Sequence, residues 1–235
     1  MHEMKKSNFS PFPIARIIRS RRKTIALQIT EEGELWVRVP YRAGEADIRR
    51  VIAKHAAWIE KHMQAAQQRK ALYPRHRFVE GELFYYLGQA YPLQFDTRPS
   101  PALSFSGSAF VLYFKAQPQA KALFEAWYRE QAAAFFPKRV AFWAERAGLS
   151  GRYAAVKVSR ARKRWGSCST KGNLNFSWRL MMAPPEMIDY VIVHELAHLR
   201  HHNHSAAFWQ EVAKQMPAYR LYHNRLKEEG YKFTL

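Results

Sequence analysis

The first half of the chain alternates between strand-like and helix-like patterns of hydrophobic residues. KTIALQI (23–29) and ELWVRVP (34–40) flank the turn sequence TEEG, which predicts a β-hairpin. From residue 45 to 70 apolar residues recur at helical spacing, which predicts one helix. Strand-like runs return between 78 and 114. They are interrupted by TRPSPALSFSGS (97–108), which is the best candidate for a linker or loop.

The pattern becomes helical again in the middle of the chain. A long helix is expected over about 118–147, with Pro137 kinking or dividing it and Gly148 stopping it. Residues 153–182 then predict a β-hairpin or a short meander. Within them NLNFSWRL (173–180) alternates apolar and polar residues, as a strand with one buried face does.

The last third is predicted to be helical. Two prolines open the helix of PPEMIDYVIVHELAHL (184–199), and Ser205 is a good N-cap for the helix that follows. A last helix is expected over about 218–229. These elements predict an α+β fold, divided into a strand-rich region with one helix, 1–115, and a second region, 116–235, or forming one continuous domain.

The motif HELAH matches H-E-x-x-H on the first of these helices. Residues four apart lie on one helix face, so the imidazoles of His194 and His198 can reach one ion at about 2.0–2.1 Å. Glu195 points to the side of that pair. There its carboxylate can take a proton from a water at the ion without being a ligand itself.

A third ligand is needed, because a catalytic zinc uses three protein ligands and an open position. On a continuing helix, His201 would lie about 10 Å beyond His194, too far to share the ion. The third imidazole must therefore return from beyond the helix end. His204 can do so if the chain turns after about Arg200, helped by Asn203, which tolerates left-handed conformations.

The sequence thus predicts a metal site of His194, His198 and His204, with one Zn²⁺ per chain and Glu195 as the catalytic base. A competing pair, His198 and His202, is also four apart but has no adjacent acid. The remaining alternative is that these are surface histidines of a basic protein.

Two segments carry a family resemblance. RWGSCSTKGNLNFSWRL, followed by PPEMIDYVIVHELAHLRHHNHSAAFW, resembles the YgjP-like zinc metallopeptidase family, related to the SprT and WLM proteases; the resemblance is strongest over about 155–227. It implies a zincin-like fold, with a small twisted sheet packed on the H-E-x-x-H helix, and a zinc metalloendopeptidase acting on protein or peptide substrates. On that pattern the ligands are His194, His198 and His204, and the catalytic residue is Glu195.

The resemblance also raises questions about neighbouring residues. His201 stands where the similarly spaced metzincin motif has a glycine, which argues against that group. NLNFSWRL is expected, mainly from the family resemblance, to be a sheet edge that pairs with an extended peptide, the alternative being an ordinary inner strand. Tyr219 and His223 are candidates for stabilising an oxyanion, or are structural. Cys168 is expected to be a packed thiol, the alternatives being a redox-sensitive group and an extra ligand.

Charge adds a second hypothesis. Thirty-eight Lys and Arg face 19 Asp and Glu, for a formal net charge of +19, and basic residues cluster at 19–23 and 152–179. Such clusters are compatible with nucleic-acid binding. The alternative function is therefore a basic nucleic-acid-binding protein with a structural or non-proteolytic metal site. No membrane span or secretory signal is recognisable and there is one cysteine, so a cytoplasmic protein is expected; the oligomeric state is left open.

Overall fold

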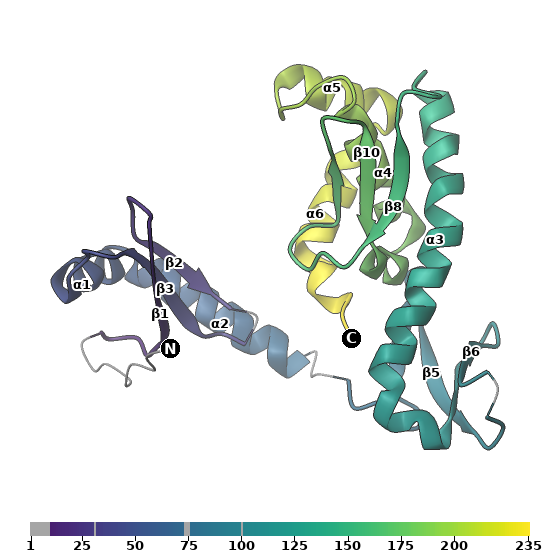
Figure 1. Ribbon diagram of the computed structural model, residues 1–235, viewed down its shortest axis with the longest axis horizontal. Helices are drawn as coiled ribbons and strands as arrows, with labels where there is room; N and C mark the ends of the chain where they lie inside the picture. Colours follow the sequence, from purple (N-terminus) through teal and green to yellow (C-terminus); the bar gives the residue numbers. More distant parts are fainter. Residues whose placement is uncertain (1–9, 31, 73–75, 100) are drawn as a thin grey trace. The chain divides into compact units, whose positions relative to one another are not determined.

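The chain forms two compact units, Met1–Arg75 and His76–Leu235, which are described separately. The computed structural model describes residues 10–30, 32–72, 76–99 and 101–235 (Figure 1). The expected division at residue 115 stays a prediction about domains, whereas the two compact units meet at residue 75.

The first unit is a three-stranded sheet with two helices. Its strands are β1 (Ile14–Ser20), β2 (Ala26–Ile29) and β3 (Leu35–Pro40), in the order β1-β3-β2. β2 and β3 pair antiparallel, which confirms the predicted hairpin, and β1 pairs parallel with β3. Alternate residues of β3 are buried with apolar residues of the helices. That core contains Ile14, Leu35, Val37, Val39, Ile48, Ile52 and Ile59.

The single helix predicted over 45–70 is wrong in one respect. The structure has two helices, α1 (Glu45–Lys54) and α2 (Ala56–Leu72), separated by His55. Ile52 and Ile59 are buried on either side of the break, while His55 is exposed. His55 is the C-cap of α1, with non-helical backbone angles (φ -112°, ψ 20°), so the chain leaves the helical conformation at this residue.

The second unit begins with a four-stranded sheet. Its strands are β4 (Leu83–Tyr86), β5 (Gln89–Asp96), β6 (Leu103–Phe105) and β7 (Phe110–Tyr113), in the order β4-β5-β7-β6. The expected linker at 97–108 is wrong, because it contains β6. Leu103 is buried, and a segment with a buried apolar residue and a strand partner is part of the fold.

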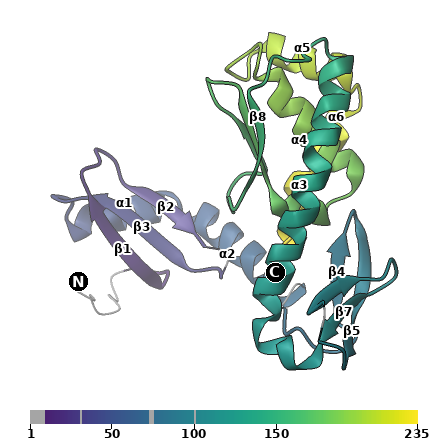
Figure 2. The same cartoon turned by 45° about the vertical axis from the view of Figure 1, so that its right-hand side comes forward.

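A short 3₁₀ helix, η1 (Phe114–Gln119), leads into α3 (Ala120–Arg146), which runs past both sheets of this unit (Figures 1 and 2). Pro137 does not divide α3. Proline removes the bond to the carbonyl four residues earlier, and both Pro137 and Ala133 are exposed, so water can satisfy that carbonyl. Gly148 ends the helix with φ of +63°, as expected of a left-handed stop.

The second sheet of this unit positions the histidine helix. It consists of β8 (Ala155–Ser159), β9 (Gly166–Cys168) and β10 (Asn173–Ser177), in the order β8-β10-β9. β10 is therefore the central strand, and the expectation that NLNFSWRL forms a sheet edge is wrong. The strand also ends at Ser177, because Trp178–Met182 form the 3₁₀ helix η2.

Three helices complete the unit: α4 (Pro185–Ala197), α5 (Ala206–Gln215) and α6 (Tyr219–Glu229), followed by η3 (Gly230–Lys232). α4 is buried on nearly all sides, in contact with α3, α5, α6 and β9. The α+β fold with a small sheet packed on the H-E-x-x-H helix is confirmed. Among the described residues, none of the helices is long and apolar enough to cross a membrane.

Candidate metal centre

Three histidine side chains meet at the end of α4. One ring nitrogen from each of His194, His198 and His204 lies within 4.8 Å of the other two. The Nε2 atoms of His194 and His204 are 3.0 Å apart. Within the described part of the chain, no other group of three or more histidine, cysteine or carboxylate side chains lies closely enough together to hold a metal ion.

His194 is held by a chain of hydrogen bonds behind it. The Tyr190 hydroxyl lies one helical turn earlier, 3.5 Å from His194 Nδ1 and 2.8 Å from His223 Nδ1. With Nε2 directed to the cluster, Nδ1–H of His194 can donate to Tyr190, whose hydroxyl can donate to His223. Such outer contacts fix the orientation of a ligating ring.

His198 is oriented by the turn that follows the helix. α4 ends at Ala197, with His198 as its C-cap, and the amide of His201 donates to the Ala197 carbonyl at 3.0 Å. His198 Nδ1 lies 2.9 Å from the His201 carbonyl, which leaves Nε2 for the cluster. The expected left-handed turn at Asn203 is wrong, since Asn203 has no positive φ. The helix ends earlier than expected, and the chain turns without a left-handed residue at position 203.

His204 comes from beyond the helix end, as the sequence predicts. It directly precedes Ser205, whose hydroxyl accepts a hydrogen bond from the Phe208 amide and caps α5. The His204 ring is stacked on Trp209, with ring centroids 5.7 Å apart. The buried Phe208 ring contacts all three histidines, at centroid distances of 4.6–4.9 Å. The first turn of α5 therefore forms the apolar floor of the cluster.

The Glu195 carboxylate is buried between α4 and β9. Glu195 is 6% exposed, and the main-chain N–H of Cys168 donates to its carboxylate. A Cβ atom on Gly166 would lie 2.6 Å from Glu195 Oε1. Only glycine therefore leaves room for the carboxylate at this place on β9, which explains the glycine of the WGSC segment.

Burial also sets the protonation states of the metal-free cluster. It raises the pKa of Glu195 to about 7, against the opposing effects of the Cys168 N–H and the charge of Arg164. Burial and the neighbouring imidazoles lower the pKa of His194 to about 3. Burial lowers the pKa of His198 as well. Neutral imidazoles are the form that ligates a metal, and a carboxyl with a pKa near 7 suits proton transfer at neutral pH.

The cluster fits a tetrahedral metal ion. Nitrogen ligands at about 2.0–2.1 Å in a tetrahedral site lie about 3.3 Å from one another. The 3.0 Å separation of His194 and His204, with all three nitrogens within 4.8 Å, needs only small side-chain movements to reach that geometry. Three imidazoles leave one position of a tetrahedron open.

Comparison with known proteins identifies the family of the chain. A model of the YgjP-like metallopeptidase domain matches residues 23–229. The chain belongs to this family. A crystal structure described as the metallopeptidase zymogen of Pyrococcus abyssi abylysin aligns with 40% of this chain and 94% of its own, at 22% identity and a TM-score of 0.36. That likeness is too distant to assign residues. No curated protein matches the chain.

This YgjP-like metallopeptidase belongs to a family of metal-dependent peptidases, hydrolases whose substrates are proteins or peptides.

The other residues considered from the sequence lie around the cluster. His201 contributes its carbonyl, and His202 is exposed. His223 contacts Tyr190, and Tyr219 stacks on Trp209 at 5.3 Å.

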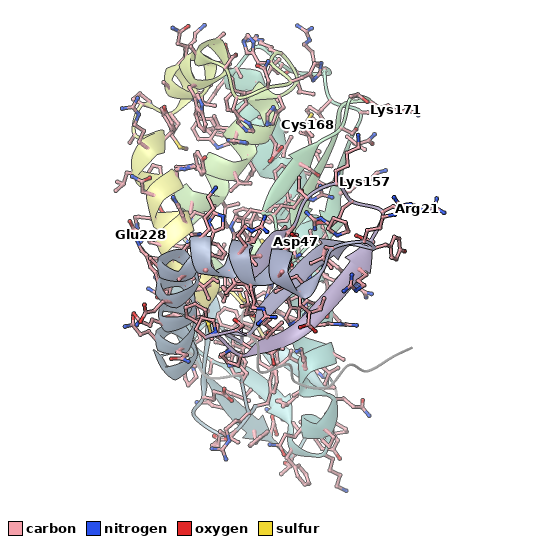
Figure 3. The ribbon with its side chains drawn as sticks, turned by 90° about the vertical axis from the view of Figure 1, so that its left-hand side faces the viewer. Arg21, Asp47, Lys157, Cys168, Lys171 and Glu228 are labelled. Carbon is pink, nitrogen blue, oxygen red and sulfur yellow. The ribbon has the colours of Figure 1, made fainter. Side chains whose placement is uncertain are left out.

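Cys168, labelled in Figure 3, is half-buried on β9. It is not part of the histidine cluster. Burial, followed by the nearby Glu195, raises the pKa of its thiol to about 11, which agrees with a packed thiol. Sequence reasoning missed Tyr190 and Gly166. The spacing of Tyr190, four residues before His194 on the same helix face, could have revealed the first.

Proposed function

We propose that this protein is a zinc-dependent endopeptidase, with one Zn²⁺ per chain held by His194, His198 and His204 and with Glu195 as its proton acceptor and donor. The observation that carries the proposal is the meeting of three imidazoles beside a buried carboxyl group whose pKa is raised to about 7. Imidazole ligands favour zinc among the common divalent ions, although other transition metals also accept them.

When bound, zinc would act as a Lewis acid that lowers the pKa of water toward about 7 and polarises the substrate carbonyl. Glu195 then has two tasks. Its carboxylate takes a proton from the attacking water, and the carboxylic acid formed gives that proton to the nitrogen of the leaving amine. The Cys168 N–H and the close approach of Gly166 hold the carboxylate in one orientation.

The free edge of β9 is the proposed place for the substrate main chain. Trp165 and Ser169 bond to the β10 side, with Ser177 and Asn173 respectively. By strand alternation, Gly166 and Cys168 direct their main-chain groups to the opposite side, where Glu195 lies. A peptide pairing with this edge would present its carbonyl beside the carboxylate.

The alternative, a nucleic-acid-binding protein with a structural metal, requires a closed site. Structural zinc is held by four protein ligands, and among the described residues the cluster has three. Nothing in the geometry favours a fourth ligand, since Cys168 lies outside the cluster and His223 Nδ1 faces Tyr190.

One set of variants tests the proposal. Glu195→Gln should bind about one zinc per chain yet lose hydrolysis of denatured protein by a factor of about 100 or more. His204→Ala should lose most of its zinc, whereas His202→Ala, an exposed neighbour, is the matched control and should keep it. Metal analysis and cleavage assays on purified variants give both readouts. Wild-type cleavage by Glu195→Gln, or full zinc content in His204→Ala, would contradict the assignment.

A further inference from the structure

A basic pocket lies in the second unit, at the end of the sheet where β8 and β10 finish. It has a volume of about 240 Å³. Its lining includes Lys121, Glu125, Arg160, Arg162, Trp178 and Arg179. None of these residues belongs to the histidine cluster.

The sheet topology explains why these cations gather. β8 and β10 are parallel, with Ser159 paired with Ser177, so both strands end at the same side of the sheet. Arg160 therefore comes directly after one strand, and Arg179 comes two residues after the other. The Ser177 hydroxyl also donates to the Ala161 carbonyl at 2.9 Å, which holds the segment after β8 against the end of β10.

The pocket has an excess of positive charge. Its lining has four basic side chains and one acidic side chain, Glu125, which is paired with Arg160 at 3.1 Å. Arg179 donates to the Thr234 hydroxyl at 2.5 Å, which fixes its guanidinium. Lys121 stands in the first turn of α3, where the helix dipole adds to the positive potential. An anionic group is the ligand that this lining suits.

The same segment connects the pocket to the metal centre. Residues 160–165 lead from the end of β8 to Gly166, and Arg162, Lys163 and Arg164 are exposed along it. The Ser177 amide donates to the Trp165 carbonyl at 2.8 Å, so the far end of the segment is fixed to β10 as well. Arg164 is near enough to Glu195 to act on it electrostatically.

We propose that this pocket binds an acidic side chain of the polypeptide substrate, and that the exposed cations of 160–164 favour substrates with acidic residues on this side of the cleaved bond. The inference rests on the proposed function. A nucleic-acid backbone is contacted by cations spread along its path, whereas here four cations surround one small pocket that also holds a carboxylate. That arrangement fits a side-chain carboxylate better than a row of phosphates.

Two fluorescent peptide pools test this inference. The peptides of both pools begin with a randomised stretch. In one pool this stretch is followed by a run of glutamates, and in the other by a run of glutamines. Cleavage is measured with the zinc-loaded wild type, and binding with zinc-loaded Glu195→Gln by fluorescence anisotropy. The glutamate pool should be preferred by about tenfold in both assays, and less so at high salt.

The double variant Arg160→Gln/Arg162→Gln should reduce that preference to less than about twofold. Its matched control is Arg152→Gln/Lys171→Gln, which removes the same charge at the other end of the sheet, where β8 and β10 begin (Figure 3 labels Lys171). The control should keep the preference. Both variants are also made in the Glu195→Gln background for the binding assay.

The outcomes separate the two proposals. A glutamate preference in binding that the pocket variant loses, without cleavage of either pool by wild type, would support the pocket and contradict the endopeptidase. Cleavage of both pools without a preference would overturn the pocket and leave the endopeptidase standing. A randomised single-stranded oligonucleotide that binds more tightly than the glutamate pool, and loses that binding in the pocket variant, would also overturn the peptide proposal.

Discussion

The proposed metal centre has two sides that are built differently. His194, His198 and Glu195 belong to α4 or its cap, and Glu195 is 6% exposed. His204 is exposed and stands on the turn between α4 and α5. One regular helix sets the spacing on the first side. On the second side the position of the imidazole depends on contacts that fix an irregular segment, so the two sides should respond differently to substitution.

The helix side of the centre consists of His194, Glu195 and His198. Its most sensitive contact should be the one between Glu195 and Gly166 of β9. In Gly166→Ala the new methyl group would overlap the Glu195 carboxylate, with 2.6 Å between Cβ and Oε1, so the carboxylate must move. We expect peptidase activity to fall by a factor of about 100 or more, because general acid–base catalysis contributes that much. Zinc content should be unchanged, since the imidazoles are not touched.

The neighbouring Ser167→Ala is the control for that substitution, because its hydroxyl is directed to Asn175 on β10. Metal analysis and cleavage of denatured protein distinguish the two variants. If Gly166→Ala lost its zinc together with its activity, displacing the Glu195 carboxylate would also disturb the histidine ligands. That result would contradict the expectation that the base and the ligands on the helix side act independently.

The turn side of the centre is the segment between α4 and α5 that carries His204. The substitution with the largest effect on this side should be at Arg200. Its guanidinium donates to Glu211 on α5 at 2.6 Å and to the carbonyl of Ala147, at the end of α3, at 2.9 Å. Arg200→Ala would leave the Glu211 carboxylate, 14% exposed, without its cation. We expect the free energy of unfolding to fall by about 2 kcal/mol and zinc affinity to fall by about tenfold.

A double-mutant cycle with Glu211→Ala measures how much of this effect comes from the ion pair. Zinc affinity is measured by competition with a chelator, and stability by urea unfolding of the metal-free protein. The exposed Arg152→Ala controls for the loss of a positive charge. Zinc affinity that is unchanged in Arg200→Ala would show that the turn holds His204 without this contact.

The same contrast explains what could be predicted from the sequence. The face shared by His194 and His198 follows from helix geometry alone, and the exclusion of His201 follows from the rise of the helix. Both need only local information. The return of His204 could be inferred, but not how it is achieved, because Arg200 bonds to Ala147, 53 residues away in the sequence.

The fold shows a similar division. Alternation predicted that β10 has a buried face, but not that β10 is central, since its parallel pairing with β8 joins separate segments. The helix α3 continues through Pro137, and Ala133, whose carbonyl loses its hydrogen bond, is exposed to solvent, which is a tertiary property. Helix identity was predictable, whereas strand order and the break at His55 depended on packing.

The smallest effect is expected at Tyr190, which supports the helix side from behind. Tyr190→Phe removes the hydroxyl between His194 and His223 but keeps a ring in a place that is 4% exposed. The contact to His194 is long, at 3.5 Å, so we expect zinc affinity to fall only about threefold. Unfolding of the metal-free protein should change little.

Tyr219→Phe is the matched control, because the Tyr219 hydroxyl accepts a hydrogen bond from Arg220, and not from a residue of the cluster. Chelator competition on both variants, with thermal unfolding of the metal-free forms, gives the two readouts. A loss of affinity in Tyr190→Phe as large as that in Arg200→Ala would mean that helix periodicity does not by itself hold His194. In that case both sides of the centre would depend on tertiary contacts to the same degree, and the contrast between them would disappear.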